Sequence, residues 1–200
     1  MRIMLASRNV HKIEELRRMA PHVDWMAMPD TLPEPPETGD SFEDNALEKA
    51  RFVARATGLT ALADDSGLEV DALGGAPGVH SRRYSPEATD ASNNARLLQE
   101  LDRLARDAGD RGERPPLRTA RYRCVLAVVH GDSERTVAGV CEGRIGWEPR
   151  GTGGFGYDPL FWPDEVPGRS MAELAPSEKD AVSHRGAAVA QLGALLGGLA

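Results

Sequence analysis

The chain has 200 residues, of which 40% are hydrophobic and 28% are charged, and its formal net charge is −7. This length and composition are typical of an ordinary globular protein with a sizeable core, so we expect one domain over residues 1–200. The acidic balance argues against a nucleic-acid polymer as partner, because binding a duplex needs a broad basic surface. A small anionic ligand is compatible with it, since a few basic side chains can converge locally.

The two cysteines, Cys124 and Cys141, lie in apolar, strand-like runs. We therefore expect buried free thiols and a reducing compartment. The apolar run at residues 3–6 is too short for a secretory signal, and no stretch approaches the length of a membrane span. These features predict a cytoplasmic protein with no membrane partner.

The first half of the chain alternates strand and helix patterns. In order, we expect a strand at 2–6, a helix capped by Asn9 that ends near Ala20, a strand at 25–28, a proline-rich loop at 29–39, and a helix from Ser41 to Gly58. The sequence Ser41-Phe42-Glu43-Asp44 resembles a capping box at the start of that second helix.

The second half adds a hairpin and a helical end. We expect a strand ending at Asp64, a short apolar stretch at 68–70, a turn-rich loop at 74–78, a helix from Thr89, a polar surface loop at 107–116, paired strands at 121–130 and 135–141, and helices from about Met171 and over 181–196. Strands mixed with crossover helices and one hairpin predict an α/β fold with a mixed sheet and flanking helices.

The acidic step Asp64-Asp65-Ser66-Gly67 follows a short apolar run. We expect it at a strand end, where carboxylates can hold a divalent cation or accept a proton from water. The alternative is a polar turn that closes the strand.

The segment Ser7-Arg8-Asn9-Val10-His11-Lys12 opens the first helix. A helix start favours a phosphate, and Arg8 and Lys12 add positive charge. The alternative is a helix cap with solvated charges.

Glu37 lies just before the second helix, on which Asn45 and Lys49 are four residues apart and share a face. Because Mg²⁺ often keeps several waters, Glu37 and Asp65 suffice as protein ligands if a triphosphate supplies others. The alternative is an exposed acidic loop.

Residues 151–159 read Gly-Thr-Gly-Gly-Phe-Gly-Tyr-Asp-Pro. They formally satisfy G-x-G-x-x-G, but Pro159 opposes the helix that a dinucleotide site requires, and no Lys-Ser or Lys-Thr pair follows as in a P-loop. The glycines let the backbone approach a ligand, with Phe155 as a stacking face. The alternative is a glycine-rich turn with Phe155 in the core.

A fourth polar segment joins Lys179 to the pair His184-Arg185 near a helix start. These residues could bind phosphate and a carbonyl-bearing base edge. The alternative is the charged start of an amphipathic helix.

Together and in this order, the segments resemble the inosine triphosphate pyrophosphatase family, the house-cleaning XTP/dITP diphosphatases. The matching text is Leu5-Ala6-Ser7-x-Asn9-x-x-Lys12, Glu37-Thr38-Gly39-x-Ser41-Phe42-x-x-Asn45-Ala46-x-x-Lys49-Ala50, Ala63-Asp64-Asp65-Ser66-Gly67-Leu68, Leu73-Gly74-Gly75-Ala76-Pro77-Gly78, Gly151 to Pro159, and Ser183-His184-Arg185-Gly186.

The resemblance implies an elongated mixed sheet in two lobes around a nucleotide cleft, and a homodimer. It implies Mg²⁺-dependent hydrolysis of ITP, dITP and XTP to the monophosphate and pyrophosphate. It leaves open which of the three is preferred, how GTP is excluded, which surface pairs and what the loop at 107–116 does.

The resemblance also implies residue roles. Asp65 is the general base with Asp64 as its electrostatic neighbour, Lys49 neutralises phosphate, and Glu37 and Asp65 ligate Mg²⁺. The residues implied to bind substrate are Ser7, Arg8, Asn9, Val10, His11, Lys12, Ser66, Phe155, Gly156, Tyr157, Asp158, Lys179, His184 and Arg185.

Many members have glycine where Arg8 and His11 stand, so both residues add possible positive charge near the phosphates. Two rival functions are a pyrophosphatase for another modified nucleotide and a nucleotide-binding sensor without turnover. The Phe155 and His184-Arg185 segments favour purines, and a pure sensor need not keep Glu37, Lys49 and Asp65 together.

Overall fold

The structure is a computed structural model, and it describes residues 2–197. Its chain divides into two compact units. Unit 1 comprises residues up to Ser66, Arg123–Val140 and the chain from Ser183 onward, and unit 2 comprises Gly67–Tyr122 and Cys141–Val182. Within the described residues, no helix is long and apolar enough to cross a membrane.

A six-stranded mixed sheet runs in the order β2-β1-β3-β4-β5-β6. The strands are β1 (Arg2–Leu5), β2 (Asp24–Ala27), β3 (Ala61–Val70), β4 (Thr119–His130), β5 (Ser133–Ile145) and β6 (Phe161–Pro163). Strand β1 pairs in parallel with β2 and β3, whereas β5 pairs antiparallel with β6. This arrangement confirms the predicted α/β class with a mixed sheet and flanking helices.

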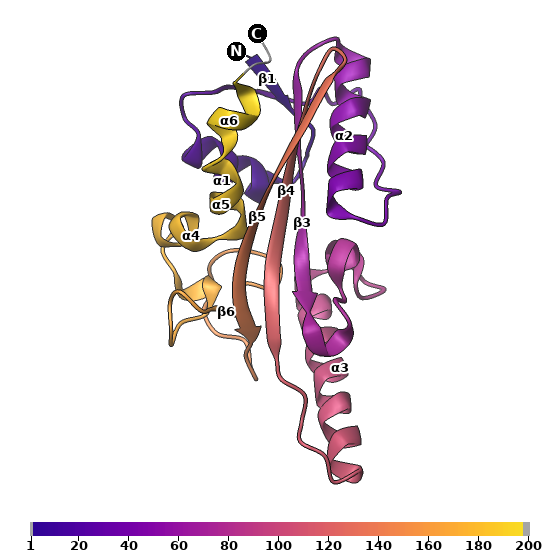
Figure 1. Cartoon of the computed structure of the whole chain (residues 1–200), viewed down its shortest axis with the longest axis vertical. Coiled ribbons are helices and arrows are strands. Elements are labelled where there is room, and N and C mark those ends of the chain that lie inside the picture. Colours follow the sequence, from indigo (N-terminus) through magenta and orange to yellow (C-terminus); the bar gives the residue numbers. More distant parts are fainter. Residues whose placement is uncertain (1, 198–200) are drawn as a thin grey trace. The chain divides into compact units, whose positions relative to one another are not determined.

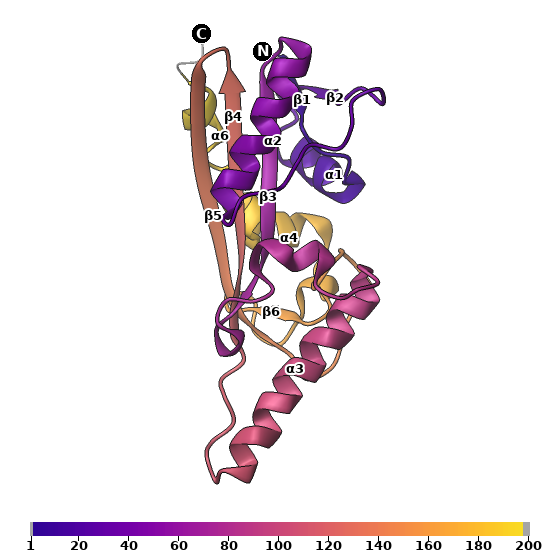
Figure 2. The ribbon, with the colours of Figure 1, turned by 90° about the vertical axis from the view of Figure 1, so that its right-hand side faces the viewer.

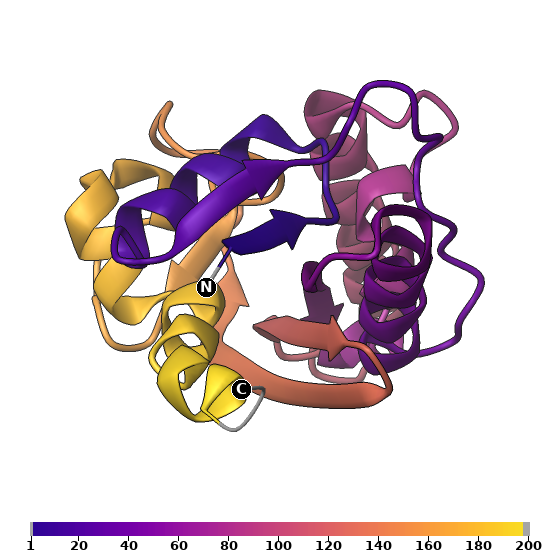
Figure 3. The same cartoon turned by 90° about the horizontal axis from the view of Figure 1, so that it is seen from above.

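In unit 1, helices cover both faces of the strands. Helix α2 (Phe42–Thr57) lies on one side, and α1 (Val10–Met19), α5 (His184–Val189) and α6 (Leu192–Leu196) lie on the other (Figure 1). Figure 3 shows the same division end on, with α2 opposite α1 and α6 across β1. Leu16 of α1 and Leu192 of α6 pack with strand residues Ile3, Leu62 and Leu126 in one buried core.

The capping residues set the starts of the unit 1 helices. Asn9 caps α1 by accepting a hydrogen bond from the Lys12 amide, as predicted. Ser41 likewise accepts from the Asp44 amide at the start of α2. The reciprocal half of the predicted capping box differs, because the Asp44 carboxylate accepts from the Ser41 hydroxyl instead.

Unit 2 is built around α3 (Asp90–Asp110), which starts at its cap Thr89 as predicted. Leu97 and Leu101 of α3 pack against a buried core that contains Leu68, Tyr122 and Phe161. Figure 2 shows α3 and the connection from its end to the start of β4. The short helices η1 (Asp71–Leu73), η2 (Gly78–Arg83), η3 (Met171–Glu173) and α4 (Pro176–Val182) complete the described helices of unit 2.

The prediction that the acidic step ends a strand is wrong. Strand β3 continues from Ala61 through Asp64 and Asp65 to Val70, and both carboxylates are buried. Two adjacent carboxylates usually indicate that a strand ends and the chain turns into a solvent-exposed loop. Here basic side chains pair with both carboxylates, so the strand retains its charge inside the fold.

Two helix boundaries also differ from prediction. Helix α3 continues to Asp110, so the polar loop begins after that residue rather than at Asp107. The helix expected over 181–196 is interrupted at Ser183, whose extended backbone caps α5 through a bond from the Gly186 amide, and again before α6. A Ser that caps a new helix thus breaks an otherwise continuous helical pattern. Strand β6 was not predicted.

Gly139 allows α5 to pack closely on β5. A Cβ at this position would overlap the backbone oxygen of His184 and the backbone nitrogen of Ala188. We expect Gly139→Ala to lower the free energy of unfolding by about 2 kcal/mol, since neither obstacle is a flexible side chain. Urea denaturation would measure this.

Gly109→Ala is the matched control for that substitution. Gly109 lies in α3, and apart from the helix's own backbone no atom lies within 4 Å of the place that a methyl group would take. The same change there should leave stability unchanged or raise it by about 0.5 kcal/mol through better helix propensity. Equal losses at both positions would contradict the close packing of α5 on β5.

Candidate active site

Lys49 is the centre of a buried cluster in unit 1. Its Nζ donates to Glu37 Oε1 at 2.8 Å, to Asp65 Oδ1 at 2.6 Å and to the backbone oxygen of Asp64 at 2.9 Å. Burial opposes its charge, but the carboxylates of Asp65 and Glu37 outweigh burial and raise the pKa of Lys49. Lys49 therefore remains an ammonium that draws together two carboxylates far apart in sequence.

Asp64 is held by a second set of cations. Arg185 Nε donates to Asp64 Oδ2 at 2.8 Å, and Lys12 Nζ lies 2.5 Å from Asp64 Oδ1. The Ser66 hydroxyl also donates to Asp64 Oδ1, at 2.8 Å. Burial alone would raise its pKa, but Arg185 and Lys12 hold the pKa of Asp64 well below its usual range.

The two adjacent carboxylates are thus shifted in opposite directions. Burial raises the pKa of Asp65, and this effect exceeds the opposing influence of Lys49 and Lys12. Neighbouring titratable groups with divergent pKa values are a common arrangement of an acid–base site. Asp64 is suited to remain an anionic anchor, whereas Asp65 is suited to accept a proton.

Arg185 is fully enclosed by the protein. The residue is 1% exposed, and its guanidinium bonds to Asp64, to Glu15 of α1 and, at 2.9 Å, to the Ser66 hydroxyl. The structure thus places Arg185 and the predicted substrate residue Ser66 in the acidic network. His184, at the start of α5, is also buried.

The predicted phosphate segment lies at the start of α1. Ser7 Oγ accepts from the Asn9 amide at 3.2 Å, and Val10 is 62% exposed. His11 is exposed as well. This helix start, with Lys12 beside Asp64, combines backbone N–H groups and positive charge next to the carboxylate cluster.

Arg8 differs from the other members of this segment. Its Nη2 donates to the backbone oxygens of Pro29, Asp30 and Leu32, at 3.2 Å for Pro29. In this conformation Arg8 ties the start of the proline-rich loop to the end of β1. Its predicted substrate contact stays a prediction.

The donor set of unit 1 fits a hard cation such as Mg²⁺. One oxygen of Glu37 and one of Asp65 lie 2.8 and 2.6 Å from the Lys49 ammonium, so the two carboxylates meet at one cationic group. Among residues 2–197, no group of three or more His, Cys, Asp or Glu side chains could hold a metal. A cation at these two carboxylates would therefore take its other ligands from water or a bound phosphate, as Mg²⁺ commonly does.

Unit 2 contains a separate buried cluster around Asp158. Its Oδ2 accepts from Lys179 Nζ at 2.6 Å and from the Phe155 amide at 2.9 Å, and its Oδ1 accepts from the Tyr122 hydroxyl at 3.1 Å. Burial, with Asp158 adding to it, raises the pKa of Tyr122 well above its usual value. Asp158 is therefore a structural anchor for the loop that carries Phe155.

The Phe155 ring is half-buried, and the Lys179 ammonium lies 4.6 Å from its centroid. Gly156 is fixed on both sides, since its amide donates to Asp90 and its oxygen accepts from Asn94. The Tyr157 hydroxyl donates to the backbone oxygen of Ser81. All five predicted residues of unit 2 thus come together in one ordered loop and its Lys179 partner.

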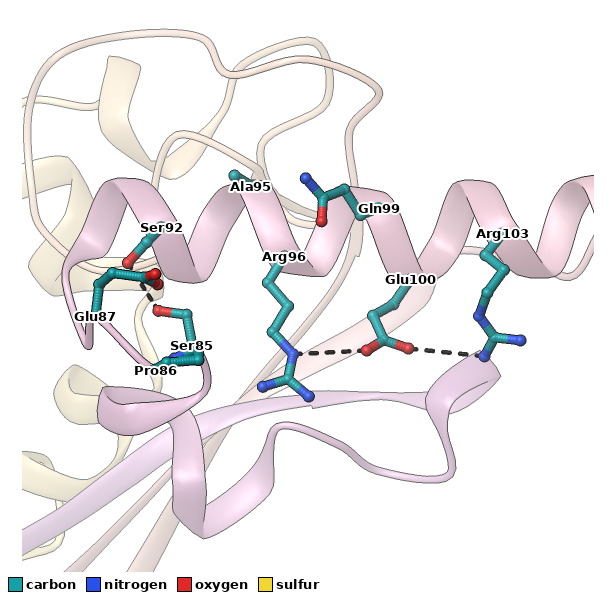
Figure 4. Close-up of a pocket in the computed structure, with 9 residues that line it drawn as sticks. All are labelled: Ser85, Pro86, Glu87, Ser92, Ala95, Arg96, Gln99, Glu100 and Arg103. Carbon is teal, nitrogen blue, oxygen red and sulfur yellow. Dashed lines mark hydrogen bonds and ion pairs between the residues drawn. The ribbon is translucent and has the colours of Figure 1, made fainter.

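Unit 2 also has a groove along α3. Figure 4 shows its lining by Ser85, Pro86, Glu87, Ser92, Ala95, Arg96, Gln99, Glu100 and Arg103. Glu100 lies between Arg96 and Arg103, 3.5 Å from the first and 3.7 Å from the second. None of the predicted site residues lines this groove.

Glu15, Asp90 and Asn94 are among the residues that shape these clusters and that sequence reasoning missed. Glu15 binds Arg185, and Asp90 and Asn94 hold Gly156. One sequence feature could have identified Glu15, because this charged residue lies next to the apolar face of α1 and three residues after Lys12. Asp90 and Asn94 gave none, since their partner lies more than sixty residues away.

Both cysteines are buried free thiols, as predicted. Cys124 Sγ donates to Asp64 Oδ2 at 3.2 Å. Burial, together with the Asp64 carboxylate, raises the pKa of the Cys124 thiol well above its usual value. Cys124 is therefore a neutral part of the Asp64 environment, not a nucleophile.

The fold and the unit 1 cluster define an α/β protein with a buried site of lysine and paired carboxylates. A protein-family model described as the Ham1 family matches residues 3–195. The chain belongs to this family, which confirms the resemblance found in its motifs.

Similar proteins agree over nearly the whole chain. A protein from an Anaeromyxobacter species named dITP/XTP pyrophosphatase is 45% identical, with 100% of this chain and 98% of that protein covered. One of the same name from Mycolicibacterium paratuberculosis is 49% identical, with 94% and 91% covered. The solved structure of a HAM1 protein from Coxiella burnetii is 42% identical, has a TM-score of 0.82, and is matched over 98% of both chains.

Proposed function

We propose that this protein hydrolyses non-canonical purine nucleoside triphosphates, namely ITP, dITP and XTP, to the monophosphate and pyrophosphate. The observation that carries the proposal is geometric: the adjacent carboxylates of Asp64 and Asp65 are both buried, and each is paired with a lysine, Lys12 and Lys49 respectively. The names of the similar proteins support the same reaction and substrate class.

Asp65 is the proposed general base. Its carboxylate accepts a proton from the attacking water while the water oxygen bonds to the α-phosphorus. The anhydride bond between the α- and β-phosphates breaks, and pyrophosphate leaves. Burial raises the pKa of Asp65, which makes its carboxylate a better proton acceptor. Asp64, which Arg185 and Lys12 keep ionised, fixes the position of its neighbour along β3.

The basic residues supply charge neutralisation, which phosphoryl transfer needs more than covalent help. We assign the helix start from Ser7 to Lys12 to the phosphates and Lys49 to the phosphate nearest the reacting centre. Glu37 and Asp65 would hold Mg²⁺, which when bound neutralises phosphate charge and lowers the pKa of water. Two carboxylates already grouped about an ammonium support this assignment.

For the base, we assign Phe155 as the stacking surface, with Gly156, Tyr157, Asp158 and Lys179 holding or flanking it. We retain the prediction that His184 and Arg185 read the base edge. Because the Arg185 guanidinium is buried and bonds to Asp64, Glu15 and Ser66, it must give up part of this network to contact a base. Donors aimed at O6 would accept hypoxanthine and xanthine and would face a donor on adenine, a mismatch that costs roughly 1–3 kcal/mol per unpaired group.

Phe155→Ala tests base stacking. We expect KM for ITP to rise about tenfold or more with a small change in kcat, because aromatic stacking contributes roughly 1–3 kcal/mol per base. Phe155→Tyr should keep KM near the wild-type value. An unchanged KM in Phe155→Ala would assign the ring to the core of unit 2.

The reaction itself is tested by incubating the protein with Mg²⁺ and, separately, ITP, XTP, dUTP, ATP and GTP, and resolving the products. IMP and pyrophosphate from ITP, with ATP and GTP nearly untouched, are the expected result. Cleavage of another nucleotide instead would keep the carboxylate assignment and discard the base assignment. Binding of ITP without any turnover would favour the sensor function.

The proposal includes a homodimer in the cytoplasm, where the nucleotide pool is found. The two free thiols support a reducing compartment. Sedimentation of the purified protein would test the dimer, with a monomer at micromolar concentration as the contrary result.

A further inference from the structure

The loop that carries Glu37 has no regular structure of its own. Between the end of β2 and the start of α2, residues 28–41 contain neither helix nor strand. The Glu37 side chain is 29% exposed, and it accepts a hydrogen bond from the Lys49 ammonium. Since ordering each loop residue costs about 1–2 kcal/mol of conformational free energy, other contacts must fix this loop.

Three consecutive residues of the loop each bind a different residue of α2, which the loop passes in Figure 1. Glu37 accepts from Lys49, and the Gly39 amide donates to Asn45 Oδ1 at 2.8 Å. Between them, Thr38 donates twice to Glu48, from its amide to Oε2 at 2.7 Å and from its hydroxyl to Oε1 at 2.8 Å.

Glu48 therefore binds the residue next to Glu37 with both carboxylate oxygens. Hydrogen bonds to a charged acceptor are roughly twice as strong as neutral ones, and a pair of them fixes direction as well as distance. Asn45 and Lys49 belong to the family motif quoted above, whereas Glu48 lies at a position where that motif allows any residue.

We propose that Glu48 is a positioning residue that holds Thr38 so that the Glu37 carboxylate faces Lys49 and Asp65 before a metal arrives. The inference rests on the proposed function for the role of Glu37 as a metal ligand. The close approach of the loop supports it, because a Cβ at Gly39 would lie 2.6 Å from Asp44 Cβ. The loop thus has little room to shift along α2 while these bonds persist.

Glu48→Ala should release the loop without unfolding the protein, since Ala favours a helix interior and Glu48 is only half-buried. We expect amide hydrogen exchange in residues 37–39 of the free protein to speed up at least tenfold. The apparent Mg²⁺ constant for ITP hydrolysis should rise about five- to tenfold, with kcat at saturating Mg²⁺ within twofold of wild type.

Glu43→Ala is the matched control, because it removes the same charge from the same helix at a position where the carboxylate accepts from Thr136 in β5. It should change neither exchange at 37–39 nor the Mg²⁺ constant. Thr38→Val removes only the hydroxyl bond and keeps the amide bond, so its effect should be smaller than that of Glu48→Ala. The double variant should match Glu48→Ala, since that substitution already removes both bonds. Glu48→Gln, which keeps one acceptor, should fall between wild type and Glu48→Ala.

The hydrogen-exchange measurement needs neither nucleotide nor metal. It therefore tests whether Glu48 holds the loop independently of the reaction. Unchanged exchange in Glu48→Ala, or additive effects of the two single variants, would overturn the inference. Faster exchange with an unchanged Mg²⁺ constant would overturn the link to the metal. A wild-type protein that hydrolyses no nucleotide would instead overturn the proposed function. The exchange result would still decide whether Glu48 holds the loop of Glu37.

Discussion

Replacing Asp65 by Asn should lower kcat for ITP by about a thousandfold or more. The substitution removes the proposed base and one metal ligand together, and general-base catalysis alone accounts for about 10²–10⁴-fold. The nucleotide dissociation constant should change far less, because the phosphate contacts assigned to the Ser7–Lys12 segment remain. Single-turnover kinetics and equilibrium binding of ITP would separate the two effects.

Asp64→Asn is the matched control for this prediction, since it makes the same chemical change one residue earlier in β3. Asp64 is the carboxylate that Arg185 and Lys12 bind, so its loss should weaken folding more than the loss of Asp65 does. Turnover by Asp65→Asn within threefold of wild type would exclude Asp65 as the base.

Removing the guanidinium in Arg185→Ala should lower the free energy of unfolding by about 3–5 kcal/mol. The change leaves Asp64 and Glu15 as buried carboxylates without their shared cation, and breaking a buried pair by deleting one partner costs about this much. Urea denaturation with fluorescence from the tryptophans would measure the loss.

Two further variants test the cause. Arg185→Lys keeps the charge but loses the fork that reaches Asp64, Glu15 and Ser66 together, so it should retain only part of the stability. Adding Glu15→Gln to Arg185→Ala should restore part of the loss by removing one orphaned charge. A loss below about 1 kcal/mol in Arg185→Ala would contradict a structural role.

Arg185 is also predicted to read the base edge. This role and its structural role in the acidic network predict different results. If Arg185 contacts the base edge, the ratio of kcat/KM for ITP over ATP should fall in Arg185→Lys even where the protein is fully folded. An unchanged ratio with lower stability would limit Arg185 to the acidic network.

The sequence predicted those parts of the fold that depend on local chemistry. Asn9, Ser41 and Thr89 were recognised as helix starts because their side chains bind amides only three residues away. Gly58 ends α2 in the left-handed conformation that favours glycine. The order of the motifs was also sufficient to predict the family, which the comparison over residues 3–195 confirms.

Its errors occurred where distant residues override local preference. Asp64 and Asp65 read as a strand end because unpaired carboxylates belong in water. Their strand continues because Lys49 and Arg185 neutralise them, and Arg185 lies 121 residues away from Asp64. The break at Ser183 was missed because a serine can also occur inside a helix, and only packing decides between the two.

The sequence by itself therefore determined the α/β class, the helix caps, the family and the set of polar residues that carry its chemistry. Only the tertiary structure decided which cation faces which carboxylate, that the pKa of Asp64 falls while that of Asp65 rises, and that Glu48 binds the loop of Glu37. The physical reason is range. Caps and periodicity act over a few residues, whereas burial and ion pairing depend on neighbours that only folding brings together.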